Sequence, residues 1–276
     1  MITTILRNIG AWFSPRRYVQ FGALGALNSR FLEVSTGKFC LPVMNCEACA
    51  LAWFICPVGV ARNALAYQTV PWMFIGMLVL FGIFVGRMFC GWICPAGLVQ
   101  DLLYKIPSPK IRFPAWSRYT KYVVLVLGVV AVAWFLGSES LLFFCNYCPV
   151  AAVQVVLPSM FQYGDWYIGV ARGVRFGVLA MVIVLSIMGS RAFCTLFCPV
   201  GAMIALTSKL GLRRLHIKED ACIKCKKCDR SCPGGLPVMA NKGSVLHQAE
   251  CIGCLDCKTS CPVNAMQLGL LPQKSG

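Results

Sequence analysis

Residues 222–233 read CIKCKKCDRSCP, and residues 251–262 read CIGCLDCKTSCP. In both stretches three cysteines stand three positions apart, and a fourth cysteine follows four positions later with a proline behind it. A short loop with this spacing folds three thiolates around one cube of iron and sulfide, and the proline lets the chain turn away. The two stretches therefore predict a small metal-binding domain at the C-terminus, over residues 213–276.

The fourth cysteine of such a run ligates the other cluster, as in bacterial two-cluster ferredoxins. We therefore expect two [4Fe–4S] clusters, one on Cys222, Cys225, Cys228 and Cys261 and the other on Cys251, Cys254, Cys257 and Cys232. Zinc is the rival interpretation, because four-cysteine zinc sites also use C-x2-C pairs. Zinc has no use for a third cysteine in register or for the trailing proline, so the spacing favours an α+β ferredoxin-like domain that moves electrons.

The rest of the chain has a much more apolar character. Of the 276 residues 58% are hydrophobic and 13% are charged, which is typical of a membrane protein rather than of a soluble domain. Three charge-free stretches, and a fourth that contains polar residues, are candidate transmembrane helices: Val70–Gly86, Tyr122–Gly137, Phe176–Ser190 and Tyr18–Val34. Buried helices of a soluble protein are the alternative, but three such stretches in one chain favour the membrane. We expect residues 1–212 to form an all-α membrane bundle of four transmembrane helices.

The distribution of Lys and Arg orients this bundle. Positive charge gathers before the first expected span and between the second and third, at Arg7, Arg16, Arg17, Arg87, Lys105, Lys110, Arg112, Arg118 and Lys121. The positive-inside rule then puts both termini and the C-terminal domain on the cytoplasmic side of a bacterial inner membrane. Met1–Ser14 lacks the apolar core of a cleavable signal peptide. The net charge of +16 suits anionic lipid headgroups, and the sequence shows no basic soluble domain for nucleic acid.

The cysteines upstream of residue 213 form an internal repeat. Cys90-x3-Cys94-Pro95 follows the second expected span, and Cys194-x3-Cys198-Pro199 follows the fourth. A C-x2-C pair precedes each of these two spans, at Cys46 and Cys49 and again at Cys145 and Cys148. The two halves, about 18–110 and 120–210, thus share the order C-x2-C, apolar helix, C-x3-C-P, and duplication of a two-helix unit is the simplest explanation.

Four Cys-Pro elements, with proline at 57, 95, 149 and 199, are expected to begin short re-entrant helices. The positive end of such a helix suits a negatively charged cluster. A third [4Fe–4S] cluster is expected at the cytoplasmic ends of the spans, on Cys90, Cys94, Cys194 and Cys198. A fourth is expected near the opposite face, on Cys46, Cys49, Cys145 and Cys148, with Cys40 and Cys56 as alternates. Cysteine also packs as a small hydrophobe, and for the outer set a disulfide or a metal relay site stays open.

The sequence shows no ligand pattern for a haem or a nucleotide cofactor. Both histidines, His216 and His247, lie in the expected cytoplasmic part, so a bis-histidine haem in the bundle is not expected. The sequence also contains no C-x2-C-H haem attachment run, no glycine-rich nucleotide motif, and no recognisable catalytic pair of acids or nucleophile with its base. Arg87 and Arg191, which introduce the C-x3-C-P motifs, are expected either to tune a cluster or to anchor helices at the membrane interface.

Together these motifs resemble a known family. The features at 86–98 and 189–202, with the twin cysteine runs, resemble the membrane polyferredoxins related to the NapH quinol dehydrogenase subunit, with MauN, NosR and the CcoG/FixG proteins as relatives. The resemblance covers most of 16–265, including the Arg17-x2-Gln20 opening. The outer cysteines depart from the familiar members and suggest a longer chain of clusters across the bilayer. The flavin-binding domain of the NosR-type architecture is not matched.

The resemblance implies an electron-transfer subunit of an oxidoreductase complex, with quinol dehydrogenation among the expected roles. Electrons would pass between the cytoplasmic-side clusters, the membrane-embedded clusters and a quinone or a redox partner across the membrane. Arg17 and Gln20 are candidates for binding a quinone headgroup. Two alternatives stay open: a maturation factor that reduces a metal or supplies electrons to a partner's cofactor, and a sensor whose clusters report the redox state.

Overall fold

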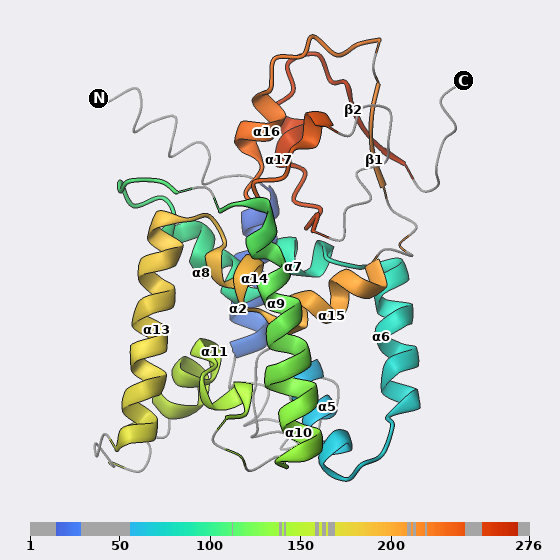
Figure 1. Ribbon diagram of the computed structural model, residues 1–276. Helices are drawn as coiled ribbons and strands as arrows, with labels where there is room; N and C mark the ends of the chain where they lie inside the picture. Colours follow the sequence, from blue (N-terminus) through green and yellow to red (C-terminus); the bar gives the residue numbers. More distant parts are fainter. Residues whose placement is uncertain are drawn as a thin grey trace.

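The computed structural model describes residues 15–28, 56–111, 113–137, 140, 142–157, 160–161, 164, 169–208, 211, 214–218, 220–240 and 250–269. Cys40, Cys46, Cys49 and His247 lie outside these described residues. The described part is a bundle of helices with a smaller α+β unit beyond one end of it (Figure 1).

The bundle combines long helices with short ones that begin at a Cys-Pro element. The long helices are α2 (Pro15–Asn28), α6 (Trp72–Phe84), the continuous run of α9 (Thr120–Val123), η3 (Val124–Ala131) and α10 (Val132–Phe135), and α13 (Val170–Met188). The Cys-Pro helices are α5 (Pro57–Ala66), α8 (Pro95–Leu103), α11 (Pro149–Ala151) and α15 (Pro199–Ser208). The remaining turns are α7 (Met88–Trp92), η2 (Ala115–Tyr119), η4 (Phe144–Asn146), η5 (Ala152–Val156) and α14 (Ala192–Leu196). All four Cys-Pro elements therefore begin helices, as expected.

Among the described residues, two helices are long and apolar enough to cross a membrane, by length and composition. They cover Trp116–Phe135 and Val170–Met188, and they overlap the expected spans Tyr122–Gly137 and Phe176–Ser190. Much of their apolar surface is exposed, with Phe135 at 82% and Val170 at 87% exposure. Lipid covers such a surface favourably, whereas a soluble monomer rarely exposes so much apolar area.

The other two expected spans stay predictions. α6 contains 13 residues, which is about 20 Å of helix and less than the thickness of the hydrocarbon core. Pro71 precedes this helix, and the chain turns after it at Gly86 with φ of 54°. Glycine adopts that left-handed conformation without strain, and it commonly ends helices. α2 overlaps the first part of Tyr18–Val34, of which residues 29–34 lie outside the described part.

The series α6, α7, α8 has the same order of elements as α13, α14, α15. In each, a long apolar helix leads into a five-residue helix and then into a Cys-Pro helix. α15 packs against α6 while α8 packs against α13, so the Cys-Pro helix of each half contacts the long helix of the other. Gly82 permits this approach, because a Cβ at that position would collide with Thr207 of α15. The boundaries of the repeat stay a prediction.

The described part of the C-terminal unit contains two strands and three short helical segments. β1 (Arg214–Ile217) and β2 (Met266–Gly269) pair antiparallel, beside α16 (Lys227–Ser231), η6 (Val238–Ala240) and α17 (Asp256–Thr259). Its buried core consists of Ile217, Val238, Cys257 and Met266, with other cysteines packed around it. So small an apolar core stabilises a domain weakly. We therefore expect its folding to depend on what the cysteines bind.

Candidate iron–sulfur centres

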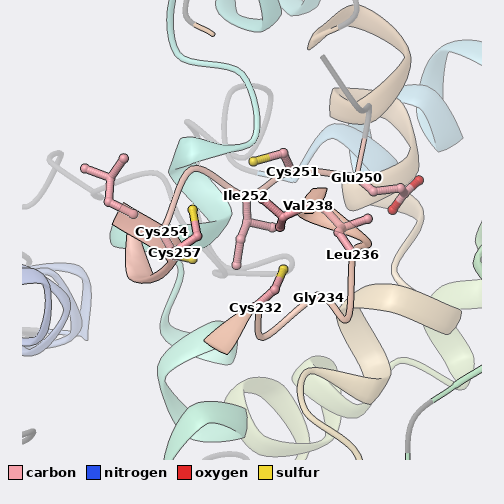
Figure 2. Close-up of a pocket in the computed structure, with 10 residues that line it drawn as sticks. Cys232, Gly234, Leu236, Val238, Glu250, Cys251, Ile252, Cys254 and Cys257 are labelled. Atoms are coloured by element: carbon pink, nitrogen blue, oxygen red, sulfur yellow. The ribbon is translucent and has the colours of Figure 1, made fainter. Parts of the chain in front are cut away.

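Four cysteines of the C-terminal unit surround one pocket, which we call the proximal pocket. Cys232, Cys251, Cys254 and Cys257 line it together with Leu236, Val238, Glu250 and Ile252, and its volume is about 390 Å³. Figure 2 shows these cysteines gathered around the pocket from two separate segments of chain. Cys232 belongs to the first cysteine run and the other three to the second.

A second pocket, the distal pocket, has the complementary set. Cys222, Cys225, Cys228 and Cys261 line it, and its volume is about 360 Å³. The last cysteine of each run thus reaches the pocket of the other run, which is the division that the spacing predicts. Ligation of clusters by these eight cysteines stays a prediction.

The two cysteine runs have left-handed backbone at equivalent positions. Left-handed φ values occur at Lys224 and its equivalent Gly253, at Lys226 and Leu255, and at Gly235 and Asn264. Non-glycine residues in this conformation are strained and cluster at functional sites. Turns of this kind direct successive N–H groups into a concavity that favours negative charge. The loops therefore fit an anionic group surrounded by thiolates.

The donor chemistry also fits an iron–sulfur cluster. Burial, together with the neighbouring Cys251 and Cys232, raises the pKa of the Cys257 thiol to about 12. Such a thiol is neutral until a cation displaces its proton. Four soft sulfur donors in each pocket select iron–sulfur clusters or zinc over hard cations. Among the described residues no three His, Cys, Asp or Glu side chains converge on a single-ion position.

The cysteines of the two C-x3-C-P motifs form a third group, the bundle site. Cys90 and Cys194 lie within α7 and α14, whereas Cys94 and Cys198 directly precede α8 and α15. Burial, together with the nearby Cys194 and Cys90 thiols, raises the pKa of Cys94 to about 12. The same two thiols act on Cys198, whose pKa burial also raises. The structure thus brings the four predicted residues within electrostatic range of one another.

Two buried arginines flank the bundle site, and each lies beside the Cys-Pro helix of the other half. Arg191, 1% exposed, lies beside Gly97 of the first half, whereas Arg87, 4% exposed, lies beside Gly201 of the second. Arg191 donates to both oxygens of Asp101 at 2.8 and 2.7 Å and to the Cys90 carbonyl at 2.9 Å. Buried positions of this kind do not describe anchors at a lipid interface, so the second expectation for these arginines is wrong.

Gln100 contacts the bundle site directly. Its Nε2 donates to Cys194 Sγ at 3.1 Å, and its Oε1 accepts the Phe193 N–H at 3.0 Å. Hydrogen bonds to sulfur ligands raise cluster potentials, because they stabilise the more negative reduced state. Sequence reasoning missed Gln100 and Asp101, although two adjacent polar residues in the apolar stretch 95–103 were a usable signal.

We expect Gln100→Leu to lower the midpoint potential of a cluster at the bundle site. The shift should be on the order of tens of millivolts, since one hydrogen bond contributes about 1 kcal/mol. A redox titration followed by EPR measures it, with the clusters of the C-terminal unit as internal controls. An unchanged potential at every cluster would contradict a role for this side chain at the sulfur.

The proximal pocket lies directly against the bundle site. Ile252 shares a buried core with Cys90 and Ile204, and Trp92 Nε1 donates to the Gly253 carbonyl at 2.9 Å. Gly91 allows the close approach, because a Cβ there would collide with the Ile252 carbonyl oxygen. The second cysteine run is therefore the one that contacts the bundle.

Ion pairs hold this contact on both sides. Arg16 of α2 binds Asp256 of α17 and Asp101 of α8, each at 2.7 Å. On the other side Glu250 accepts hydrogen bonds from Arg87 and from the buried Lys121. Burial favours protonated Glu250, but the charges of Arg87 and Lys121 hold its pKa below the ordinary value. Two carboxylates thus hold the C-terminal unit against the bundle: Glu250, next to Cys251, and Asp256, next to Cys257.

Gln20 has a structural role in this interface. Its side chain is 1% exposed, and its Nε2 donates to the Gly91 carbonyl at 2.8 Å. Arg16 Nε donates to the same carbonyl at 2.9 Å. These bonds satisfy a buried amide group within the protein. Binding of a quinone headgroup by Arg17 and Gln20 stays a prediction.

The outer set is only partly described. Cys56 and Cys145 pack against the same buried core, which includes Val58, Val129 and Phe143. Cys148, at the start of α11, lies within electrostatic range of Cys56 and Arg175. The structure thus brings Cys56, expected only as an alternate, together with two predicted residues of this set. Cys40, Cys46 and Cys49 lie outside the described residues.

Comparisons with known proteins agree with the cysteine motifs. The family described as "4Fe-4S binding domain" matches residues 68–114 and again 173–218. The family described as "4Fe-4S dicluster domain" matches residues 221–266. The two matches to the first family contain one C-x3-C-P motif each. No solved structure matches the chain.

Curated relatives include characterised and uncharacterised proteins. An uncharacterised protein of Methanocaldococcus jannaschii is 30% identical over 57% of this chain and 63% of its own length. The regulatory protein NosR of Stutzerimonas stutzeri is 26% identical over 58% of this chain and 21% of its own. The methylamine utilisation ferredoxin-type protein MauN of Methylorubrum extorquens is 30% identical over 85% of this chain and 80% of its own. The chain therefore belongs to the family of ferredoxin-type 4Fe–4S electron-transfer proteins that includes MauN.

Proposed function

We propose that this chain is a membrane electron relay, in which the C-terminal unit exchanges electrons with a third [4Fe–4S] site in the bundle. The packing of Ile252 against Cys90 carries this proposal, because it joins the proximal pocket to the bundle site through one buried apolar contact. Clusters held by these cysteines would supply one-electron carriers. The protein would supply their order and spacing: distal pocket, proximal pocket, bundle site.

The residues at the interface hold the two sites in a fixed relation. Trp92, Arg16 and Glu250 each bond across the contact. Ile252 is 6% exposed and Ile204 3%, so water is excluded between the two groups of cysteines. A rigid and dry contact needs little reorganisation when charge moves across it. This arrangement suits repeated electron transfer.

Buried cations support negative charge at the bundle site. Arg87, Arg191 and Lys121 are each less than 5% exposed, and two carboxylates, Glu250 and Asp101, partner them. Charges interact strongly in such low-dielectric surroundings. We propose that they raise the potential of the bundle cluster above that of a cluster without such neighbours.

The route continues, in this proposal, towards the other face of the bundle. Cys56, Cys145 and Cys148 support an outer [4Fe–4S] cluster, completed by a further cysteine of the outer set. A quinone or a redox partner subunit across a bacterial inner membrane would then be the final donor or acceptor. The N- and C-termini would lie on the cytoplasmic side, with four spans between them.

Iron content tests the relay. Anaerobically purified full-length protein should contain about twelve irons and twelve acid-labile sulfides per chain for three cubanes, or about sixteen of each with the outer cluster. EPR of the reduced protein should resolve interacting clusters. About eight irons would leave only the ferredoxin pair and would overturn the bundle site. In that case a sensor or a maturation factor would be the better interpretation.

A further inference from the structure

The two cysteine runs have the same local backbone but opposite surroundings. Each begins Cys-Ile-x-Cys, and their left-handed residues occur at equivalent positions. Yet Ile252 is 6% exposed, and its equivalent Ile223 is 61% exposed. One loop is covered by the bundle, whereas its counterpart presents the same apolar side chain to solvent.

The covered loop shows how this loop shape makes a redox contact. Ile252 enters an apolar core beside Cys90. Asp256, the first residue of α17, pairs with the cation Arg16 at 2.7 Å. An apolar centre and a complementary charge at the helix start are therefore among the contacts that seat the loop against another group of cysteines.

The exposed loop has the opposite charge. Lys227 stands at the position of Asp256, and Lys226 stands at the position of Leu255. Exposed cations surround Ile223 in the chain at Lys218, Lys224, Lys226, Lys227 and Arg230. Three acids lie in the same stretch of sequence: Glu219, Asp220, which is exposed, and Asp229, which accepts the Met239 N–H at 2.9 Å. The balance over 218–230 is positive.

This basic surface coincides with the most accessible cluster ligand. Cys225 is exposed, whereas the other cysteines of the described residues are buried or partly buried. An electron can therefore reach the distal pocket from a partner seated on this loop. Cationic surfaces around such a point steer an acidic partner and increase its rate of association.

We propose that Lys218 and residues 220–230 form the docking surface for a small acidic one-electron carrier protein. The inference rests on the relay function proposed above. One electron moves from the reduced iron–sulfur or flavin centre of the carrier, which is oxidised, to the oxidised cluster of the distal pocket, which is reduced. No covalent bond forms or breaks. Ile223 provides the apolar centre of the contact, and the Lys and Arg residues provide its charged rim.

Stopped-flow reduction of the full-length protein in phosphatidylcholine nanodiscs tests this surface. The probe is photoreduced flavodoxin, an acidic flavoprotein, and the signal is bleaching of the cluster absorbance. We expect the second-order rate constant to fall about tenfold between low and high salt. Lys227→Glu should lower the low-salt rate constant by a similar factor, and it places an acid favourably at a helix start. Ile223→Ala should lower the rate constant at both salt concentrations.

Lys258→Glu is the matched control, because Lys258 is an exposed cation on the equivalent helix α17. It should leave the flavodoxin rate nearly unchanged. Reduction by the small photoreduced deazaflavin radical should be the same in all variants. Equal flavodoxin rates in wild type and Lys227→Glu would overturn the docking surface while leaving the relay intact. Failure of both reductants to bleach any cluster would instead overturn the relay itself.

The same experiment in phosphatidylglycerol nanodiscs separates a lipid from a protein occupant. If the cations bind anionic headgroups, the anionic lipid will abolish the flavodoxin rate difference between wild type and Lys227→Glu, which would contradict carrier docking. Retention of the difference on both lipids supports the proposal.

Discussion

Cys198→Ala should remove about four irons per chain and leave the two clusters of the C-terminal unit in place. Cys198 is one of the four cysteines of the bundle site and directly precedes α15. A cubane with three remaining protein thiolates in an apolar site is readily lost, because alanine supplies no ligand in place of the missing thiolate. Loss of the bundle cluster should also stop electron transfer beyond the C-terminal unit, because the described residues offer no second route.

Iron analysis and EPR measure this outcome on protein purified without oxygen. Ser208→Ala is the control, because it removes a polar group from the same helix at a distance from the cysteines. Its iron content should equal that of the wild type. Unchanged iron in Cys198→Ala would show that the bundle cysteines hold no cluster.

Gly91→Ala should slow electron transfer between the C-terminal unit and the bundle without removing iron. A Cβ at this position would overlap the Ile252 carbonyl oxygen, which belongs to rigid backbone and not to a flexible side chain. Overpacking of this kind costs about 1–3 kcal/mol. The cost is relieved when the proximal loop moves away from Cys90, because the collision lies between the two units.

Freeze-quench EPR after rapid reduction follows the arrival of electrons at the bundle cluster. The expected delay is about tenfold or more, since 1.4 kcal/mol corresponds to a factor of ten. Gly76→Ala on α6 is the matched control, because a Cβ there meets no atom within 4 Å. A normal rate in Gly91→Ala would show that the Ile252 contact is not the route.

Much of the candidate site could be predicted because ligand spacing is a local property. The division of eight cysteines between two pockets, the four helices that begin at Cys-Pro and the convergence of Cys90, Cys94, Cys194 and Cys198 all agree with prediction. Each follows from steric rules that act within a few residues or from the symmetry of a repeated motif. Two of the four expected spans, Tyr122–Gly137 and Phe176–Ser190, likewise overlap the two described helices that are long and apolar enough to cross a membrane.

The polar residues of the interface were less accessible to prediction. Arg87 was expected to serve either a cluster or the lipid interface, and only its pairing with Glu250, 163 positions away, decides between them. Gln20 was considered for a quinone but donates to the Gly91 carbonyl. A polar residue in an apolar helix signals a partner, but it does not identify that partner.

The sequence by itself determined which cysteines form each pocket, because the chain between them is too short to allow many alternatives. Only the tertiary structure decided which cysteine run contacts the bundle. Ile223 and Ile252 occupy identical local sequence positions, and no short-range rule distinguishes them. Their different exposure arises from long-range packing: Gly91 allows the backbones to meet, Gly253 leaves room for the Met88 side chain, and Arg16 pairs with Asp256, where the other run carries Lys227. Contacts between residues far apart in the chain depend on the whole fold, and these contacts leave the first run free to meet a partner.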